Sequence, residues 1–448
     1  DVSFIPWITL FEDGLELFMA AKKEINVTKD IIVFCADHFS VKSDNPRCIA
    51  IQHGVYEDIP TRYMTRKKFF YVKENVNGVQ MKILALCDTI EFQNRATIEA
   101  ISKHYGCIEV LCKAYIANLF KRKTKSNKLH ISYFYTSIPE RLRLINWLSS
   151  FELKIIKVLW GRKIKECDII LITSPHMAFL LPLLTRKKII YLIIDPHILM
   201  KSRRTYFMEK QLLERADLIL VTSKSLKEKY ISKYFGLNLD NVYYWPNTVD
   251  LSIWDYEKLI PCRKNNGEVT IGFCGNMNEI TVDMSLLDEI TSHYNSIKFE
   301  LAGKINFKNK DNLSKINKIF EKINVTYSGW ISYLDIPRKV INWDICLMFD
   351  AKSEISEYVH HNKIYQYLAL GKPIVIQRTH HDYDELASVV YICDKTEDFL
   401  VSITEAIKHI NDAKYINNCI KLAKLNSSTE RAKQFMNIIG NIKGDIGI

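Results

Sequence analysis

The sequence predicts an α/β protein in which parallel strands alternate with helices. Short apolar segments recur along most of the chain, and amphipathic segments of helical length separate them. This alternation is typical of parallel sheets. The clearest unit is HNKIYQYLALGKPIV, residues 361–375. Its helix is expected from Lys363 to Leu370, because Gly371 follows as a stop signal and Pro373 opens an apolar strand.

A first set of strands and helices is expected between residues 81 and 250. Each strand is a short run rich in Ile, Leu and Val, as strands buried on both faces are. The strands are expected at 81–88, 107–112, 129–135, 167–173, 188–194, 216–222 and 242–247. The helices are expected at 94–105, 139–165 and 205–215. Ser223 is placed to cap one more helix, because its hydroxyl can accept a backbone N–H.

A second set follows the polar linker at 263–267. It repeats the alternation of apolar strands and amphipathic helices. The strands are expected at 269–275, 297–303, 325–330, 344–349, 373–376 and 389–393. The helices are expected at 283–294, 312–322, 336–342, 363–370, 396–410 and 428–439.

The first 80 residues do not fit this plan. Their apolar and amphipathic segments are in the order strand, helix, strand, strand. Three interpretations stay open: an extension of the first sheet, the true start of the first domain, or the remnant of a separate α/β unit. The chain begins at Asp1 without a signal-peptide pattern, which is expected of a fragment or a processed chain.

Composition and cysteine spacing favour a globular protein of the cytoplasm. The 448 residues are 48% hydrophobic and 25% charged. No apolar run is long enough to cross a bilayer, so no transmembrane helix is expected. The eleven cysteines are scattered singly, without a CxxC pair. This spacing argues against a zinc site and against a disulfide scaffold, and it fits a reducing compartment.

Basic residues are concentrated around the helix from Pro139 to Lys165. The net charge is +11, and residues 121–165 hold twelve Lys or Arg against two Glu. Apolar and basic residues alternate along the helix, which suits an anionic membrane interface and equally a packed helix with a basic outer face. Peripheral attachment to the inner face of the membrane therefore stays open. No nucleic-acid-binding signature accompanies the charge, so nucleic acid is not an expected partner.

The start of the helix at 363–370 is a candidate phosphate site. A helix N-terminus carries partial positive charge and free N–H groups, which favour anions. Asn362 and Lys363 lie at this start, and Lys363 adds a cation. A second candidate is the glycine-containing turn at 272–276, because glycine lets the backbone approach a ligand closely. A tight turn without a ligand is the alternative there.

Several segments resemble those of a known enzyme family. The pattern Asn-Lys-x-x-Gln-Tyr-Leu-Ala-x-Gly-Lys-Pro at 362–373 resembles the donor-binding segment of GT-B glycosyltransferases, in particular those of the family 4 type. IGFCGNMNEI at 271–280 resembles the start of the family's donor domain. PNTVD at 246–250 resembles the family's Pro-Asn-Gly-Val-Asp junction and is interpreted as structural. The resemblance covers roughly residues 81–440.

The resemblance implies two Rossmann-like domains whose parallel sheets face each other across a cleft. Residues 81–250 would form the acceptor-side domain. Residues 251–448 would bind the nucleotide sugar and end in a crossover helix that returns to the first domain. Residues 1–80 would be an extra N-terminal α/β segment of uncertain role.

The resemblance assigns the donor to the second domain. It places the turn at 272–276 against the diphosphate, and the polar loop at 350–361 beside the sugar. The implied donor-binding residues are Gly272, Gly275, Asn276, Trp330, Asn362, Lys363 and Gln366. Trp330 follows a strand where the family holds the nucleotide base, so it either lines that pocket or serves packing.

The chain departs from the family at two places. The family's Arg and Lys after the turn are replaced by uncharged and acidic residues from Asn276 to Glu279. Its two glutamates, eight residues apart, fall on Tyr358 and Gln366. Gln366 can still bond ribose hydroxyls, because an amide both donates and accepts. Glu357, beside Tyr358, reaches the sugar if the loop shifts by one residue.

Polar residues that follow the first-domain strands are candidates for the acceptor site. Ligands of parallel α/β sheets bind at the carboxyl ends of strands. The candidates are Asp88, His176, Asp195, His197, Arg203 and Arg204. The two arginines suit an acceptor phosphate. His176, Asp195 and Glu357 are the catalytic candidates. His176 or Asp195 alone is more often a capping or core polar residue, and Glu357 alone is equally explained as a solvated loop carboxylate.

The resemblance implies a retaining glycosyltransferase that needs neither metal nor another cofactor. It would move a sugar from a nucleotide sugar to a cell-surface glycan or a lipid-linked acceptor, as in polysaccharide biosynthesis. Charge that develops on the leaving phosphate needs fixed donors or cations, and Lys363 at a helix N-terminus supplies them. The alternatives are a nucleotide-sugar epimerase, a glycerol- or ribitol-phosphate transferase, and a non-catalytic scaffold. Gln366 and the missing Arg and Lys favour the scaffold.

Overall fold

The structure is a computed structural model that describes residues 33–35, 49–51, 82–87, 95–105, 108–115, 130–136, 146–200, 203–259 and 268–445. Residues 1–80 and residues 81–448 form separate compact units. In the first unit, β1 (Val33–Cys35) and β2 (Ile49–Ile51) pair in parallel. They correspond to two of the predicted strands, and the other elements predicted for residues 1–80 lie outside the described residues.

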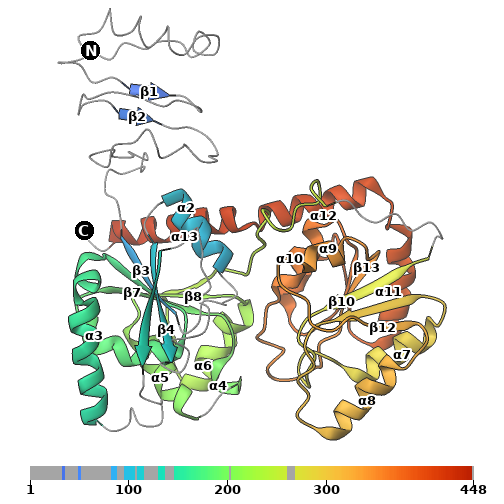
Figure 1. Cartoon of the computed structure of the whole chain (residues 1–448), viewed down its shortest axis with the longest axis horizontal. Coiled ribbons are helices and arrows are strands. Elements are labelled where there is room, and N and C mark those ends of the chain that lie inside the picture. The colour runs from blue at the N-terminus through green and yellow to red at the C-terminus, as the bar shows by residue number, and fades with distance from the viewer. Residues whose placement is uncertain are drawn as a thin grey trace, which may run out of the picture. The chain divides into compact units, whose positions relative to one another are not determined.

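The first sheet of the larger unit has seven parallel strands in the order β5-β4-β3-β6-β7-β8-β9 (Figure 1). The strands are β3 (Ile83–Cys87), β4 (Ile108–Tyr115), β5 (His130–Thr136), β6 (Ile169–Ile172), β7 (Lys188–Ile193), β8 (Leu218–Val221) and β9 (Val242–Tyr244). Each matches one predicted strand. The strand order reverses between β3 and β6, which is where ligands of such sheets bind. We call this sheet and its helices the first domain.

The second sheet has six parallel strands in the order β12-β11-β10-β13-β14-β15. The strands are β10 (Thr270–Cys274), β11 (Lys298–Ala302), β12 (Val325–Tyr327), β13 (Ile345–Met348), β14 (Ile374–Gln377) and β15 (Val390–Cys393). All six were predicted, and the order again reverses beside the first strand, between β10 and β13. We call this sheet and its helices the second domain.

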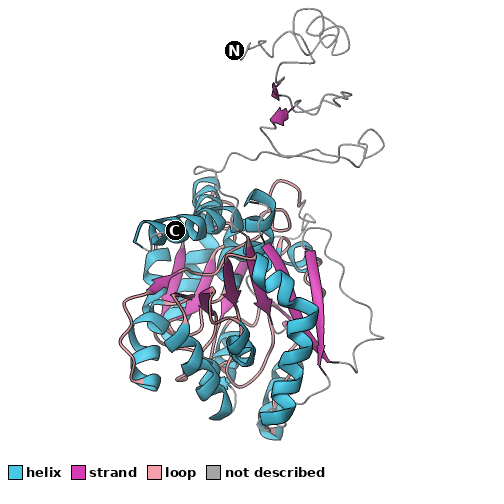
Figure 2. Ribbon diagram, turned by 90° about the vertical axis from the view of Figure 1, so that its left-hand side faces the viewer, coloured by secondary structure: helices cyan, strands magenta, loops and turns pink. Residues whose placement is uncertain are grey.

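Both faces of the first sheet are buried, as the near-continuous apolar strands predict. Alternate residues of β3 belong to different hydrophobic clusters, with Leu84 and Leu86 on one face and Ile83 and Cys87 on the other. Helices cover both faces (Figure 2). The sheet is therefore the central layer of the first domain.

The described helices of the first domain include the predicted ones and two short helices, η5 and α4, that were not predicted. They are α2 (Arg95–Tyr105), α3 (Asn146–Glu166), η5 (Pro175–Leu183), α4 (His197–Met200), α5 (Arg203–Arg215), η6 (Leu226–Tyr230) and α6 (Ile231–Phe235). The N–H of Leu226 donates to the Ser223 hydroxyl at 3.1 Å, which confirms the predicted cap. The predicted start of the helix at 139 lies outside the described residues.

The helices of the second domain include two that were not predicted. They are α7 (Met284–His293), α8 (Lys310–Phe320), α9 (Ile336–Val340), α10 (Asn362–Ala369), η7 (His381–Leu386), α11 (Thr396–Lys408) and α12 (Ala413–Leu425). The unpredicted helices are the short η7 and α12, and the N-terminus of α12 is capped by Asp412.

The last helix, α13 (Ser428–Asp445), returns to the first domain as predicted. Phe435 of α13 packs against Trp245 with ring centroids 5.6 Å apart, inside a cluster of the first sheet. Across the described ranges, no helix combines the length and apolarity that a membrane span requires.

Candidate functional site

Three strand-end loops of the second domain meet at glycines. Gly275, Gly303 and Gly329 follow β10, β11 and β12, which are neighbours in the sheet. The N–H of Gly275 donates to the C=O of Ala302 at 2.9 Å, and that of Gly303 to the C=O of Gly329 at 2.7 Å. Gly303 has a φ of 130°, and a methyl group there would overlap the carbonyl oxygen of Gly275. The backbones therefore approach so closely that glycine is required.

Lys363 lies against this glycine surface. It is the second residue of α10, after the half-buried Asn362. Its Nζ is 4.5 Å from the centroid of the Phe273 ring, and a methyl group on Gly275 would lie 2.5 Å from that Nζ. Burial lowers the pKa of the Lys363 ammonium, and the nearby Asp350 carboxylate opposes the shift. The structure thus brings together Gly275 and Lys363, two predicted donor residues.

Asp350 is the buried anion beside Lys363. Its Oδ1 lies 3.1 Å from Nε2 of His361, the residue that precedes α10. Burial by itself would raise the pKa of Asp350, but His361 and Lys363 outweigh it and hold that pKa below its usual value. Sequence reasoning placed Asp350 only in a polar loop beside the sugar. Its position just after β13, at the carboxyl edge of the sheet, was the available signal.

Gly272 is not part of the turn in which it was predicted. β10 continues to Cys274, so Gly272 lies inside a strand and the turn begins at Gly275. A methyl group at Gly272 would overlap the Trp343 ring. That ring is fixed by its Nε1, which donates to Glu300 at 2.7 Å. The missing side chain of Gly272 therefore makes room for Trp343.

The remaining donor candidates differ in exposure. Asn276 is exposed, and Trp330 exposes 64% of its surface, which rules out a core position for its ring. The Nζ of Lys304 lies 5.8 Å from the centroid of the Trp330 ring. Gln366 is half-buried and follows Lys363 by three residues on α10, so the two share a helix face.

Two acceptor candidates lie at one edge of the first sheet. β6 and β7 are neighbours, His176 is the second residue of η5, which follows β6, and Asp195 follows β7. The N–H of His176 donates to the Ser174 hydroxyl at 3.3 Å. His197 is buried at the start of α4. The candidates outside the described residues are Asp88 and the side chains of Arg203 and Arg204.

A buried carboxylate beneath this edge was not predicted. Glu209 of α5 has no exposed surface and accepts hydrogen bonds from the hydroxyls of Tyr191 at 3.1 Å and Tyr230 at 2.9 Å. The Tyr230 hydroxyl also accepts the N–H of Ile198 in α4 at 3.2 Å. Burial and Glu209 raise the pKa of Tyr230, so its hydroxyl keeps the proton that it donates. This network holds α4, which begins at His197, at the end of β7.

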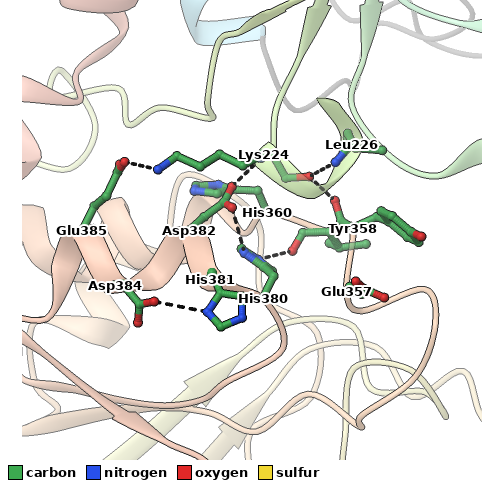
Figure 3. A network of polar contacts seen from close by, with 12 residues as sticks. Lys224, Leu226, Glu357, Tyr358, His360, His380, His381, Asp382, Asp384 and Glu385 are labelled. Atoms are coloured by element: carbon green, nitrogen blue, oxygen red, sulfur yellow. Dashed lines mark hydrogen bonds and ion pairs between the residues drawn. The ribbon is translucent and has the colours of Figure 1, made fainter. Parts of the chain in front are cut away.

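The acids near the second-domain loop are engaged by the protein itself. Glu357 lies 2.6 Å from the Nζ of Lys229 in the first domain. The chain contains one Asp-x-Asp sequence, Asp382 to Asp384. Asp382 accepts a backbone N–H of the first domain at 2.8 Å (Figure 3), and Asp384 pairs with Arg378. Within the described ranges, no group of three or more His, Cys, Asp or Glu residues could hold a metal ion.

Comparisons with known proteins identify the fold. Residues 108–253 match the family described as Glycosyltransferase Family 4. HepE of Anabaena in complex with UDP matches with a TM-score of 0.63 and 14% identity, over 81% of this chain and 100% of that chain. A glycosyltransferase from Rickettsia africae ESF-5 matches with 0.62 and 13%, over 81% and 98%. Sucrose-phosphate synthase from Thermosynechococcus elongatus matches with 0.61 and 12%, over 81% and 100%. No curated protein matches the chain.

The structural matches show that the chain has the GT-B fold, with two Rossmann-like domains of parallel strands, as predicted. The predicted resemblance to family 4 glycosyltransferases is confirmed by the match within the first domain. The predicted enzyme class agrees with the matched family and with the Rickettsia africae structure, which are both described as glycosyltransferases.

Proposed function

We propose that the chain transfers a sugar from a nucleotide sugar to a glycan or lipid-linked acceptor, without a metal ion. The observation that carries the proposal is the Lys363 ammonium held against Gly275 at the start of α10. Retention at the anomeric carbon is carried over from the family resemblance. The strand ends with His176 and Asp195 are proposed to receive the acceptor.

The arrangement at α10 suits the charge that develops during transfer. When the bond between the anomeric carbon and the diphosphate breaks, negative charge grows on the leaving phosphate. The first N–H groups of a helix have no partner within the helix and lie at its positive end. Lys363 adds a full positive charge beside them, and Asp350 holds the neighbouring His361. These groups would stabilise the leaving phosphate as a metal ion does in other transferases.

UDP-sugars are the first donors to test. HepE was solved with UDP and with UDP-glucose, which makes uridine the leading base. The exposed Trp330 ring offers an apolar face for a base. The Gln366 amide can bond ribose hydroxyls from the helix face that it shares with Lys363.

A thermal-shift screen with UDP, GDP, CMP, ADP and dTDP tests the donor site. A ligand at about 100 times its Kd stabilises the fold by about 2.7 kcal/mol, so one nucleotide should raise the Tm by a few degrees. Lys363→Ala should abolish that shift. Lys298→Ala is the matched control, because Lys298 is exposed at the opposite end of a strand of the same sheet. No shift with any nucleotide would contradict the proposal and favour a scaffold.

Product analysis separates transfer from epimerisation. The chain is incubated with the donor that gives the shift, first alone and then with lipid-linked and soluble glycans. Transfer predicts a new glycan and release of the nucleoside diphosphate only when a glycan is present, apart from slow hydrolysis. A change of the sugar while it is still attached to the nucleotide would indicate an epimerase instead.

The exposed face of α3 supports the proposal that the protein attaches peripherally to the inner face of an anionic membrane. Its exposed apolar residues fall on one helical stripe, and Val158 exposes 84% of its surface. The stripe is Phe151, Ile155, Val158 and Leu159. Exposed cations of the same helix include Lys154, Lys157 and Lys165. An apolar stripe flanked by lysines is what anionic lipid headgroups and acyl chains both favour.

Sedimentation with phosphatidylglycerol vesicles at low salt tests the α3 surface. The unaltered chain should sediment with them, and far less with phosphatidylcholine vesicles. Val158→Asp should stay in the supernatant, because it removes apolar area and adds a negative charge. Val401→Asp is the control, since Val401 is similarly exposed on α11 of the second domain. Equal sedimentation of the two variants would contradict the contact.

A further inference from the structure

The segment that leads into α10 is fastened to the first domain by its backbone. The Ser223 hydroxyl donates to the C=O of Tyr358 at 2.8 Å. The Asn247 side-chain amide donates to the C=O of His360. Both donors come from the ends of first-domain strands, and both acceptors lie within four residues of the start of α10. We call this contact of residues 358–360 with the first domain the joint, and Figure 3 shows Tyr358 and His360 in it.

The side chain of Tyr358 lies in the core of the first domain. It is 0% exposed and belongs to the hydrophobic cluster on one face of the first sheet, although its backbone belongs to the second domain. Its ring centroid is 5.5 Å from that of Tyr230 and 6.1 Å from that of Tyr234. Tyr230 is the residue that bonds Glu209 beneath α4. Tyr358 thus packs directly on the network that supports the acceptor edge.

The second domain closes the same joint from its own side. The His380 ring donates to the C=O of Val359 at 3.0 Å. Asp382, two residues later, accepts the backbone N–H of Lys224 at 2.8 Å. Contacts from both domains therefore fix the three consecutive carbonyl groups of residues 358–360.

Exposed ion pairs surround this joint. Three lysines of η6, α6 and the turn before them face glutamates of the second domain. The pairs are Lys224 with Glu385, Lys229 with Glu357 and Lys233 with Glu354. Exposed pairs contribute little to stability and are screened by salt. The buried ring of Tyr358 and the carbonyl contacts are therefore the stronger part of the joint.

The helix beyond the joint is packed in the second domain. Ile364, Tyr367 and Leu368 of α10 belong to a hydrophobic cluster of the second sheet. Lys363 follows Tyr358 by five residues. A short, fixed segment thus joins the core of the first domain to the residue that is proposed to bind the diphosphate.

We infer that Tyr358 is a positioning residue, which sets Lys363 relative to the strand ends of the first domain. The inference rests on the proposed function, with the donor at Lys363 and the acceptor at the first sheet. Nucleotide binding needs only second-domain groups, whereas transfer needs both substrates aligned. A displacement of about 1 Å can cost about a hundredfold in rate. Loss of the anchor should therefore separate binding from transfer.

Tyr358→Ala and Tyr358→Phe form the test, because Phe keeps the ring and the backbone acceptor. We measure the Kd of UDP by calorimetry, the kcat of UDP release from UDP-glucose in the presence of the glycan that supports transfer, and hydrogen exchange in residues 354–366. In Tyr358→Ala, kcat should fall about tenfold or more while the Kd changes by less than about threefold. Hydrogen exchange in residues 354–366 should also become faster in this variant. Tyr358→Phe should match the unaltered chain. Unchanged kcat and exchange in Tyr358→Ala would overturn the inference.

A second pair keeps the test informative if Tyr358→Ala does not fold. Ser223→Asp and Ser223→Asn both keep a helix-capping oxygen, but only Asn has an N–H to donate to the C=O of Tyr358. Slower turnover by the Asp variant at equal UDP affinity supports the inference, and equal turnover overturns it. Failure of the unaltered chain to bind UDP would instead count against the proposed function, which the exchange data do not address.

Discussion

The carboxyl edges of the two sheets, where the strands end, are built from different groups. We call that of the second sheet the backbone edge, or donor edge, and that of the first sheet the side-chain edge, or acceptor edge. At the second sheet, the backbones of Gly275 and Gly303 approach so closely that no side chain fits between them. At the first sheet, the edge is supported by buried side chains, because Glu209 accepts hydrogen bonds from Tyr191 and Tyr230 beneath α4. A backbone surface suits a group that every nucleotide-sugar donor shares, its diphosphate. An edge supported by side chains can change by substitution and so suits a variable acceptor.

Gly303→Ala should break the backbone edge and have the largest effect. The φ of Gly303 disfavours a side chain, and the added methyl group would overlap the oxygen of Gly275. We expect the free energy of unfolding to fall by about 3 kcal/mol or more, measured by urea denaturation. The nucleotide-induced shift in Tm should also be lost.

Gly329→Ala is the control for this substitution. Gly329 also has a positive φ, of 71°, but no atom of the described residues lies within 4 Å of an added methyl group. Only backbone strain should then remain, about 1 kcal/mol. Equal losses in the two variants would mean that the close approach of Gly275 and Gly303 does not define the edge.

Tyr230→Phe should weaken the side-chain edge and leave the other unchanged. It removes the hydroxyl that bonds Glu209 and the N–H of Ile198, in a buried place. We expect a loss of about 2 kcal/mol in the free energy of unfolding, with an unchanged nucleotide shift. Tyr234→Phe should lose much less, because its hydroxyl meets the exposed Glu354. A smaller nucleotide shift in Tyr230→Phe would show that the two edges are not independent.

The sequence was sufficient to predict the sheets and less so the site. Every strand of both sheets was predicted, because a strand buried on both faces needs an apolar run that is visible locally. The helix α10 could also be predicted from local signals, because Lys363 lies at its start and Gly371 follows its end. These signals lie within one segment and need no knowledge of distant contacts.

Residues whose role depends on distant contacts were missed or misplaced. Gly272 resembles a turn residue locally, and only Trp343, 71 residues later, explains why a strand lacks a side chain there. Glu209 lies in a charged amphipathic helix, where an acid is normally solvated. Tyr191 and Tyr230, which bury it, come from other elements. The side-chain edge was therefore harder to predict than the backbone edge.

His360, at the joint between the two domains, should give the chain a pH dependence. Burial, with a further contribution from His380, lowers the pKa of His360 to about 3. An ordinary histidine has a pKa near 6.5. Between about pH 6.5 and pH 3, His360 is therefore protonated in the unfolded chain and neutral in the folded chain. The free energy of unfolding should fall by about 1 kcal/mol for each pH unit below about 6.5. Above about pH 6.5, His360 should not make it depend on pH.

Urea denaturation at pH 7, 6 and 5 measures this slope. The His360 ring stacks on that of Tyr365 with centroids 5.6 Å apart. His360→Phe keeps an aromatic ring there and removes the titrating group, so the loss of stability on acidification should become smaller. His381→Phe is the matched control, because it makes the same replacement at an exposed position. A slope that His360→Phe does not change would place the acid sensitivity elsewhere.

Lys229→Ala should have the smallest effect and shows what holds the two edges together. Lys229 and Glu357 pair at 2.6 Å, but both side chains contact water, so salt and solvent weaken the pair. We expect no measurable change in the urea midpoint or in the Kd of UDP. A slight loss of turnover at low salt should disappear as salt is added. A midpoint that falls as far as in Tyr230→Phe would mean that surface charge, rather than the buried Tyr358, joins the acceptor edge to the donor edge.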